Sequence, residues 1–224
     1  MVSVPLPRIL LTGFTPFGGD SVNPSALVAQ HLHDRQLAGH RVVSALLPVV
    51  FGDARETLWS LVRKHHPLLV LCLGQAGGRA NLSVERVALN LADARIPDNL
   101  GQQPMDEPVD ADAPTAYFST LPVKAMAQAI SQAGLPAEVS LSAGSFVCNH
   151  VYFGLMHQLA TVRSFRAVRA GFMHLPYLDT QVAQMPTPRP PSLSLEQMVS
   201  GVRAALRAAI EHPVDLRLSG GHLH

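Results

Sequence analysis

Pro67-Leu68-Leu69-Val70-Leu71-Cys72-Leu73 is the stretch that decides the fold, because seven consecutive residues carry no charged side chain. A short apolar run of this kind is typical of a strand with two buried faces, as in a parallel sheet covered by helices. Residues 8–13 contain a second short apolar run, which follows Arg8 and stops at Gly13. The sequence therefore predicts a sheet that is buried on both sides.

Predicted helices alternate with these strands in the order that a twisted, mostly parallel α/β sheet requires. The helical segments are residues 25–37, 53–64, 123–132 and 146–161, followed by a last amphipathic helix that begins near Leu195. Further strands are predicted at residues 42–47, 139–142 and 167–174. We therefore expect a single-domain, three-layer α/β/α sandwich over residues 1–224, with a frayed Gly- and His-rich tail at residues 219–224.

Two segments depart from this alternation. Residues 83–90 alternate polar and apolar side chains, which predicts a half-exposed strand. Residues 97–114 are rich in Asp, Pro, Gly and Gln, which predicts a long loop. Such a loop is either a lid over a site or a surface excursion, and the composition favours neither.

Composition excludes several functional classes. A net charge of +1 with scattered basic residues lacks the electrostatic footprint of a nucleic-acid binder. No stretch reaches the roughly 18 apolar residues of a membrane span, and no basic leader precedes an apolar run, so we expect a cytoplasmic protein with no membrane partner. The patterns H-E-x-x-H, C-x-x-C and G-x-x-x-x-G-K-[ST] are absent, so a metal or nucleotide mechanism gains no support.

The two cysteines, Cys72 and Cys148, are predicted to be free thiols, because a chain of 224 residues needs no disulfide to fold. Cys72 lies inside the apolar run and is expected to fill the core. Cys148 follows the small-residue turn Ser142-Ala143-Gly144-Ser145 at a predicted helix start, where the helix dipole favours a thiolate. Cys148 is therefore either a nucleophile or a small buried hydrophobe.

A thiol that attacks an amide needs a base, and His174 is the best placed of eleven histidines. It ends an apolar run, so it is expected at the carboxyl end of a strand, where catalytic groups of open α/β sheets collect. Glu85 could orient that imidazole, although a Glu next to an Arg, here Arg86, in an edge-like strand is more often part of a solvated ion pair. Residues 74–79, Gly-Gln-Ala-Gly-Gly-Arg, form either an anion-binding nest or a tight turn.

Several spaced segments together resemble the pyrrolidone-carboxylate peptidases, also called type I pyroglutamyl peptidases. The resembling segments are residues 11–19, 23–25, 74–79, 85–98, 142–149 and 171–177. The departures are mild, because Phe146 replaces a commoner tyrosine and Leu141 stands where a polar residue is usual. The likeness spans nearly the whole chain and keeps the segments in the same order.

The resemblance implies a cysteine peptidase that hydrolyses the amide bond after an N-terminal pyroglutamyl residue of peptides, without a cofactor or metal. It implies a catalytic triad of Cys148, His174 and Glu85, with Arg95 near the oxyanion. It also implies that Phe14, Phe17 and Gln75 line the substrate pocket, and that the protein is a homo-oligomer, either a dimer or a tetramer.

The chemistry of the substrate fits these residues independently, because a pyroglutamyl ring is a small neutral lactam with two apolar faces. Phe14 and Phe17 lie three residues apart on a Gly- and Pro-rich loop, so both rings can face one cleft. Three alternatives remain open. They are a thiol-dependent amidase for another small blocked N-terminal group, an inactive small-molecule binding protein, and a phosphorylase-like enzyme that uses the Gly-rich loop for phosphate.

Overall fold

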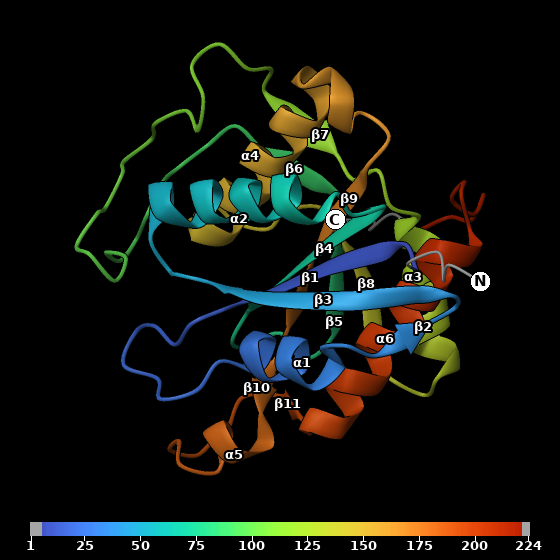
Figure 1. The fold of residues 1–224 in the computed structure, drawn as a ribbon. Helices are drawn as coiled ribbons and strands as arrows, with labels where there is room; N and C mark the ends of the chain where they lie inside the picture. Colours follow the sequence, from blue (N-terminus) through green and yellow to red (C-terminus); the bar gives the residue numbers. More distant parts are fainter. Residues whose placement is uncertain (1–5, 221–224) are drawn as a thin grey trace.

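In the computed structural model, which describes residues 6–220, a seven-stranded sheet runs through the molecule (Figure 1). In spatial order its strands are β2 (Gln36–Leu37), β3 (His40–Leu47), β1 (Arg8–Phe14), β4 (Leu69–Gln75), β9 (Arg169–Leu175), β5 (Leu82–Glu85) and β8 (Ala137–Ser140). β3, β1, β4 and β9 are parallel neighbours, whereas β5 is antiparallel to β9 and parallel to β8. The predicted, mostly parallel sheet is confirmed.

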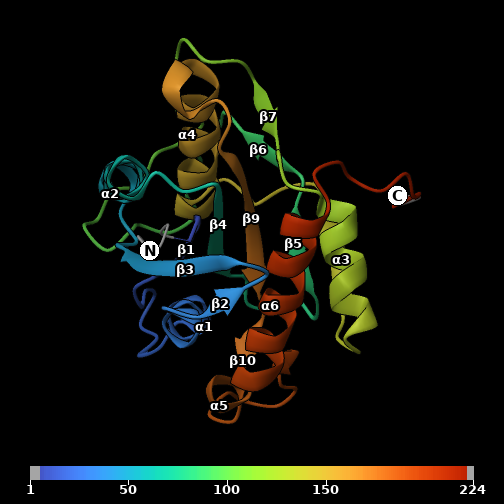
Figure 2. The same cartoon turned by 45° about the vertical axis from the view of Figure 1, so that its right-hand side comes forward.

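Five long helices cover the two faces of this sheet (Figures 1 and 2). α2 (Phe51–His65) and α4 (Val147–Thr161) lie on one face, and α1 (Pro24–Leu32), α3 (Val123–Gln132) and α6 (Leu195–Glu211) lie on the other. The expected three-layer α/β/α arrangement is therefore confirmed. Among residues 6–220, no helix combines the length and the apolar character that crossing a membrane would require.

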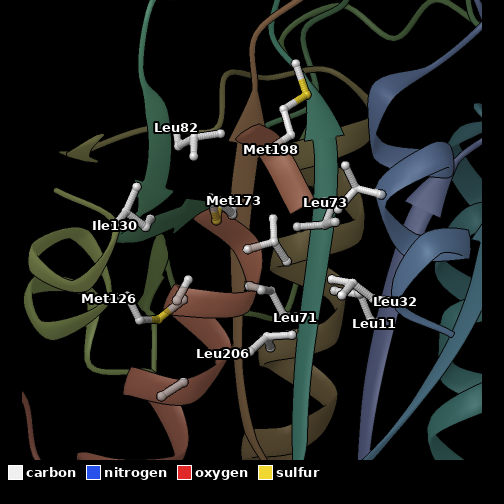
Figure 3. Close-up of a cluster of buried hydrophobic side chains, with 14 of the residues drawn as sticks. Leu11, Leu32, Leu71, Leu73, Leu82, Met126, Ile130, Met173, Met198 and Leu206 are labelled. Atoms are coloured by element: carbon white, nitrogen blue, oxygen red, sulfur yellow. The ribbon is translucent and has the colours of Figure 1, made fainter. Parts of the chain in front are cut away.

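Each face of the sheet has its own hydrophobic core. Figure 3 shows the core beneath α1, α3 and α6, where Leu11, Leu71 and Leu73 from the strands meet Met126, Met198 and Leu206 from the helices. The opposite core, beneath α2 and α4, is rich in aromatic rings, including Tyr152, Phe153 and Phe172. The alternation of side chains along each strand supplies both cores from the same apolar runs.

The first helix is shorter than predicted. Asn23 caps α1 as expected, because its side chain accepts from Ser25 N, but the helix ends at Leu32 and not near residue 37. Asp34 follows with a φ of 59°, a left-handed conformation that ends the helix, and its N–H donates to Val42 O. The next residues therefore form β2, which turns back antiparallel onto β3.

The strand predicted over residues 83–90 is divided and is not half-exposed. β5 ends at Glu85, and β6 (Val87–Leu89) leaves the sheet to pair with β7 (Ala116–Phe118). All four residues of β5 are buried, because the strand lies between β9 and β8 and not at an edge. The expectation of a solvated face was therefore wrong for β5.

Short elements near the carboxyl ends of the strands carry too little periodicity to predict. They are β10 (Tyr177–Leu178), α5 (Asp179–Val182) and β11 (Ser192–Leu193). Residues 97–114 contain no regular helix or strand, as predicted. The carboxylate of Asp98 fastens that loop to the start of α2 by accepting from Phe51 N, and it also accepts from Leu100 N and Gln102 N. The tail predicted at residues 219–224 falls mainly on residues 221–224, which lie outside the described residues.

Candidate active site

Cys148 lies in the first turn of α4, as predicted, and its thiol lies over the sheet beside β4. A Cβ atom built at Gly74 would be only 2.9 Å from Cys148 Sγ, so the sulfur packs directly on the backbone of β4. Gly74 is paired in register with His174 on β9. The backbone register thus brings the thiol to the strand position next to the imidazole.

The turn before Cys148 is fastened to the segment that follows β6. Ser145 Oγ donates to Asp93 O at 2.7 Å, and Asp93 N donates to Ser145 O at 3.0 Å. The buried Asn149 accepts from Leu89 N and donates to Leu89 O and Leu91 O, each at 2.9 Å. No sequence pattern indicates this role of Asn149, other than its place next to the cysteine.

His174 and Glu85 form a buried pair. His174 lies near the carboxyl end of β9 and is 4% exposed, and Glu85 at the end of β5 is fully buried. His174 Nδ1 donates to Glu85 Oε1 at 2.8 Å, which leaves Nε2 as the free position of the ring. The structure therefore makes Glu85 the orienting partner of His174 and excludes a solvated pair with Arg86, whose guanidinium lies over the Phe118 ring.

The thiol and the imidazole are near one another but are not bonded in this conformation. No hydrogen bond joins Cys148 Sγ to His174 within residues 6–220. Catalytic hydrogen bonds are often long before substrate binds and shorten in the complex. His150, the other nearby histidine, packs against Phe51 and has its pKa lowered to about 4, mainly by burial, so it is a poor base at neutral pH.

The thiol pKa differs from the expectation drawn from the helix start. Burial, and to a smaller extent the negative charge of Glu85, raise the pKa of the Cys148 thiol to about 12. The dipole of α4 is outweighed because the sulfur is desolvated beside a buried carboxylate. Cys148 therefore rests as a neutral thiol that needs a base. Cys72 fills the core as predicted, and burial raises its pKa to about 12 as well.

A small cavity opens beside the thiol, lined by Phe14, Phe17, Asn23, Val49, Gln75, Phe146, Val147 and Cys148. The three residues predicted for the pocket, Phe14, Phe17 and Gln75, thus meet the predicted nucleophile in one place. Two of the lining rings, Phe17 and Phe146, contact each other with ring centroids 6.2 Å apart. Apolar walls with a few polar groups are typical of small-molecule sites.

Gln75 is held by two polar neighbours that sequence reasoning missed. Its Nε2 donates to Asp20 Oδ2 at 3.1 Å, and its Oε1 accepts from Gln181 Nε2 at 3.1 Å. These contacts fix which end of the amide is the oxygen and which is the nitrogen. Asp20 and Gln181 come from the first loop and from α5, 161 positions apart, so no local pattern could have paired them.

Arg95 makes no polar contact that connects it to Cys148, His174 or Glu85 among the described residues. It is exposed on the loop that follows Ala94, and within the described chain it has no ion pair or hydrogen bond. Its neighbour Ala94 is held by Pro104 O and by the side chain of Gln103. A role near the oxyanion therefore stays a prediction.

A parallel α/β sheet that presents a thiol, an imidazole and a buried carboxylate at the ends of its strands defines an α/β cysteine hydrolase. A family model described as pyroglutamyl peptidase matches residues 7–212. The chain belongs to the pyroglutamyl peptidase family.

Individual relatives agree with this family over almost the full chain. A pyrrolidone-carboxylate peptidase of Yersinia pestis (strain Pestoides F) is 46% identical over 97% of this chain and 99% of its own length. The crystal structure of pyroglutamyl peptidase I from Bacillus amyloliquefaciens superposes with a TM-score of 0.91 at 40% identity, over 96% of this chain and 100% of that one. The pyrrolidone carboxyl peptidase from Thermococcus litoralis gives 0.89 at 36% identity, over 95% and 100%.

Proposed function

We propose that this enzyme removes the N-terminal pyroglutamyl residue from peptides, with Cys148 as nucleophile, His174 as acid and base, and Glu85 as the orienting carboxylate. The observation that supports this most strongly is the cavity that joins Phe14, Phe17 and Gln75 to Cys148. A neutral lactam ring requires apolar walls and few polar groups, whereas a free α-ammonium group would require a carboxylate or metal.

The first half-reaction forms a thioester. His174 Nε2 takes the thiol proton as Cys148 Sγ attacks the pyroglutamyl carbonyl carbon, because the raised pKa of the thiol prevents it from ionising alone. The resulting imidazolium is stabilised by Glu85 at 2.8 Å. It then donates the proton to the leaving amine as the carbon–nitrogen bond breaks, which leaves a thioacyl-enzyme and a shortened peptide.

The second half-reaction restores the enzyme. His174 removes a proton from water as the water oxygen attacks the thioester carbonyl, the carbon–sulfur bond breaks to release pyroglutamate, and the imidazolium returns the proton to Cys148 Sγ. Backbone N–H groups in the first turn of α4 are unpaired within the helix and suit the oxyanion of each tetrahedral intermediate. Arg95 is proposed to assist there, on the strength of the resemblance alone.

One assay tests the proposal directly. Release of a chromophore from pyroglutamyl amide should be fast, whereas the prolyl and free glutaminyl analogues should react far more slowly, since they lack the lactam carbonyl or the closed ring. Iodoacetamide should block the reaction and EDTA should not. Equal rates on all three amides would refute the assigned specificity.

We also propose that the chain acts as a single-domain, homo-oligomeric enzyme of the cytoplasm, a dimer or tetramer. The two free thiols suit a reducing compartment, and the oligomeric state rests on the family resemblance.

A further inference from the structure

Arg79 places a permanent positive charge against the buried carboxylate of the triad. Its Nη1 donates to Glu85 Oε1 at 2.7 Å, the same oxygen that accepts from His174 Nδ1 at 2.8 Å. Its Nη2 donates to Ser142 O at 3.2 Å, in the turn that precedes Cys148. One guanidinium thus contacts the triad acid and the segment that carries the nucleophile.

We propose that Arg79 is a positioning residue that sets the protonation balance of the Cys148–His174 pair and holds the turn before Cys148. The proposal rests on the proposed function of these two residues and assigns a role to a side chain outside the triad. Among residues 6–220, no group forms a hydrogen bond with the buried Glu85 Oε2, and the imidazole and the guanidinium share the other oxygen. The Glu85 carboxylate therefore interacts with two cationic side chains: His174, whose charge depends on pH, and Arg79, whose charge does not.

The sign of the electrostatic effect is fixed by the charges alone. Glu85 opposes ionisation of the Cys148 thiol, whereas Arg79 favours it. A fixed cation favours the loss of a proton from a thiol near it, so Arg79 opposes the rise in the pKa of the Cys148 thiol that Glu85 contributes. Removal of Arg79 should therefore raise the apparent pKa of the Cys148 thiol further.

The other titratable groups around the cluster do not reverse this sign. Those that face it are Cys72 on β4, Glu138 on β8 and Tyr152 on α4. Burial raises the pKa of Cys72 to about 12 and raises that of Tyr152 as well, so both stay neutral at working pH. The carboxylate of Glu138, on the neighbouring strand β8, accepts from Ser83 and Asn81.

Three variants separate the effect of the positive charge of Arg79 from the effect of its hydrogen bonds to Glu85 and Ser142. Arg79→Gln removes the charge and keeps an amide donor. Arg79→Lys keeps the charge, but a single ammonium group cannot reproduce the guanidinium's two-pronged contact with Glu85 and Ser142. Arg86→Gln is the matched control, since it removes the same charge next to Glu85 in sequence, from a side chain that packs over Phe118.

The experiment records two pH profiles for each variant. One is kcat/KM on a chromogenic pyroglutamyl amide, and the other is the rate at which iodoacetamide alkylates Cys148. In Arg79→Gln, the limb of the first profile that reports the Cys148 thiol and the midpoint of the second profile should move to higher pH by on the order of one unit. The limbs should stay near the wild-type positions in Arg79→Lys and Arg86→Gln.

The outcomes are distinguishable. Unshifted limbs in Arg79→Gln, with only a lower amplitude and a lower Tm, would overturn the proposal in favour of a purely structural role. Should Arg79→Gln fail to fold, Arg79→Lys decides, because the lost contact with Ser142 predicts at least a several-fold fall in kcat with KM unchanged. Wild-type kcat in that variant would refute the positioning role. Alkylation needs no substrate, so it tests Arg79 even if pyroglutamyl amides prove not to be cleaved.

Discussion

A methyl group added at Gly74 would collide with the nucleophilic sulfur. An ideal Cβ at that position lies 2.9 Å from Cys148 Sγ and 2.9 Å from Phe172 Cζ, about 0.5–1 Å closer than an ordinary nonbonded contact. The Phe172 ring cannot yield, because it is fully buried and three other aromatic rings pack around it with centroids 4.8–6.4 Å away. In Gly74→Ala we therefore expect the sulfur to move.

The displacement predicts a loss of activity larger than the loss of stability. A misplacement of about 1 Å at a reacting atom costs on the order of 10²-fold in rate, and overpacking costs about 1–3 kcal/mol. We expect kcat for a chromogenic pyroglutamyl amide to fall roughly 10- to 100-fold. Tm should fall by about 2–4 °C for each kcal/mol in a chain of this size. Steady-state kinetics and thermal unfolding measure the two effects separately.

Gly171→Ala is the matched control on the neighbouring strand. A Cβ there would lie 2.8 Å from Ser119 Oγ and 2.9 Å from Leu121 Cδ1, an equal crowding that does not involve the thiol. This variant should lose stability to a similar or smaller extent and keep its kcat. The reasoning fails if Gly74→Ala retains wild-type kcat, or if both variants lose kcat to the same degree.

Three further predictions test the site residues. Cys148→Ala should abolish hydrolysis and Cys72→Ala should keep most of it, since Cys72 only fills the core; equal losses in an amide-release assay would contradict this. In His174→Ala the thiol pKa stays raised by burial and by Glu85, so alkylation of Cys148 by iodoacetamide should become fast only towards pH 12; rapid alkylation at pH 7 would exclude His174 as the base. Phe17→Ala should lower kcat/KM roughly ten- to several hundred-fold with little change in Tm. Phe14→Ala should lower kcat/KM similarly and also destabilise the protein by about 3 kcal/mol, because Phe14 is deeply buried; wild-type kcat/KM in both variants would show that the pocket lies elsewhere.

The sheet could be predicted because each buried strand is a run of consecutive apolar residues, which is visible in the local sequence. The apolar run around Leu69–Gln75 has nearly the same length in sequence and in structure, since burial on both faces leaves no polar position to obscure it. The end of α1 could not be predicted in the same way. It depends on Asp34 adopting a left-handed conformation, which the sequence around it permits but does not require.

The error over β5 has a physical cause that concerns the site. Alternating polar residues normally indicate a solvated face, but Ser83 and Glu85 turn towards Glu138, His174 and Arg79. The polar half of this strand builds a buried network and does not meet water. The local sequence pattern does not distinguish a solvated face from a buried polar network. Except for Arg79, the partners of Ser83 and Glu85 in this network lie 55 to 89 positions away in the sequence.

The partial failure over the Cys148 pKa is of the same kind. The helix start is a local feature and was visible in the turn that precedes it, whereas desolvation and the charge of Glu85 arise only when distant segments meet. Pairwise geometry of this sort is a property of the packed chain. The family resemblance supplied the triad because it carries that geometry implicitly.

Asn149 gives the site a mechanical property. Its amide pairs with the backbone of Leu89 as a neighbouring strand would, and Tyr152, one turn further along α4, donates to Glu85 O. Hydrogen bonds therefore join helix α4, which carries the nucleophile, to both ends of the segment from Glu85 to Leu89. We expect the helix and this segment to open together as one cooperative unit. Hydrogen exchange at the Leu89 amide should consequently report every opening that separates Cys148 from Glu85, so that a slow-exchanging Leu89 marks an assembled catalytic centre.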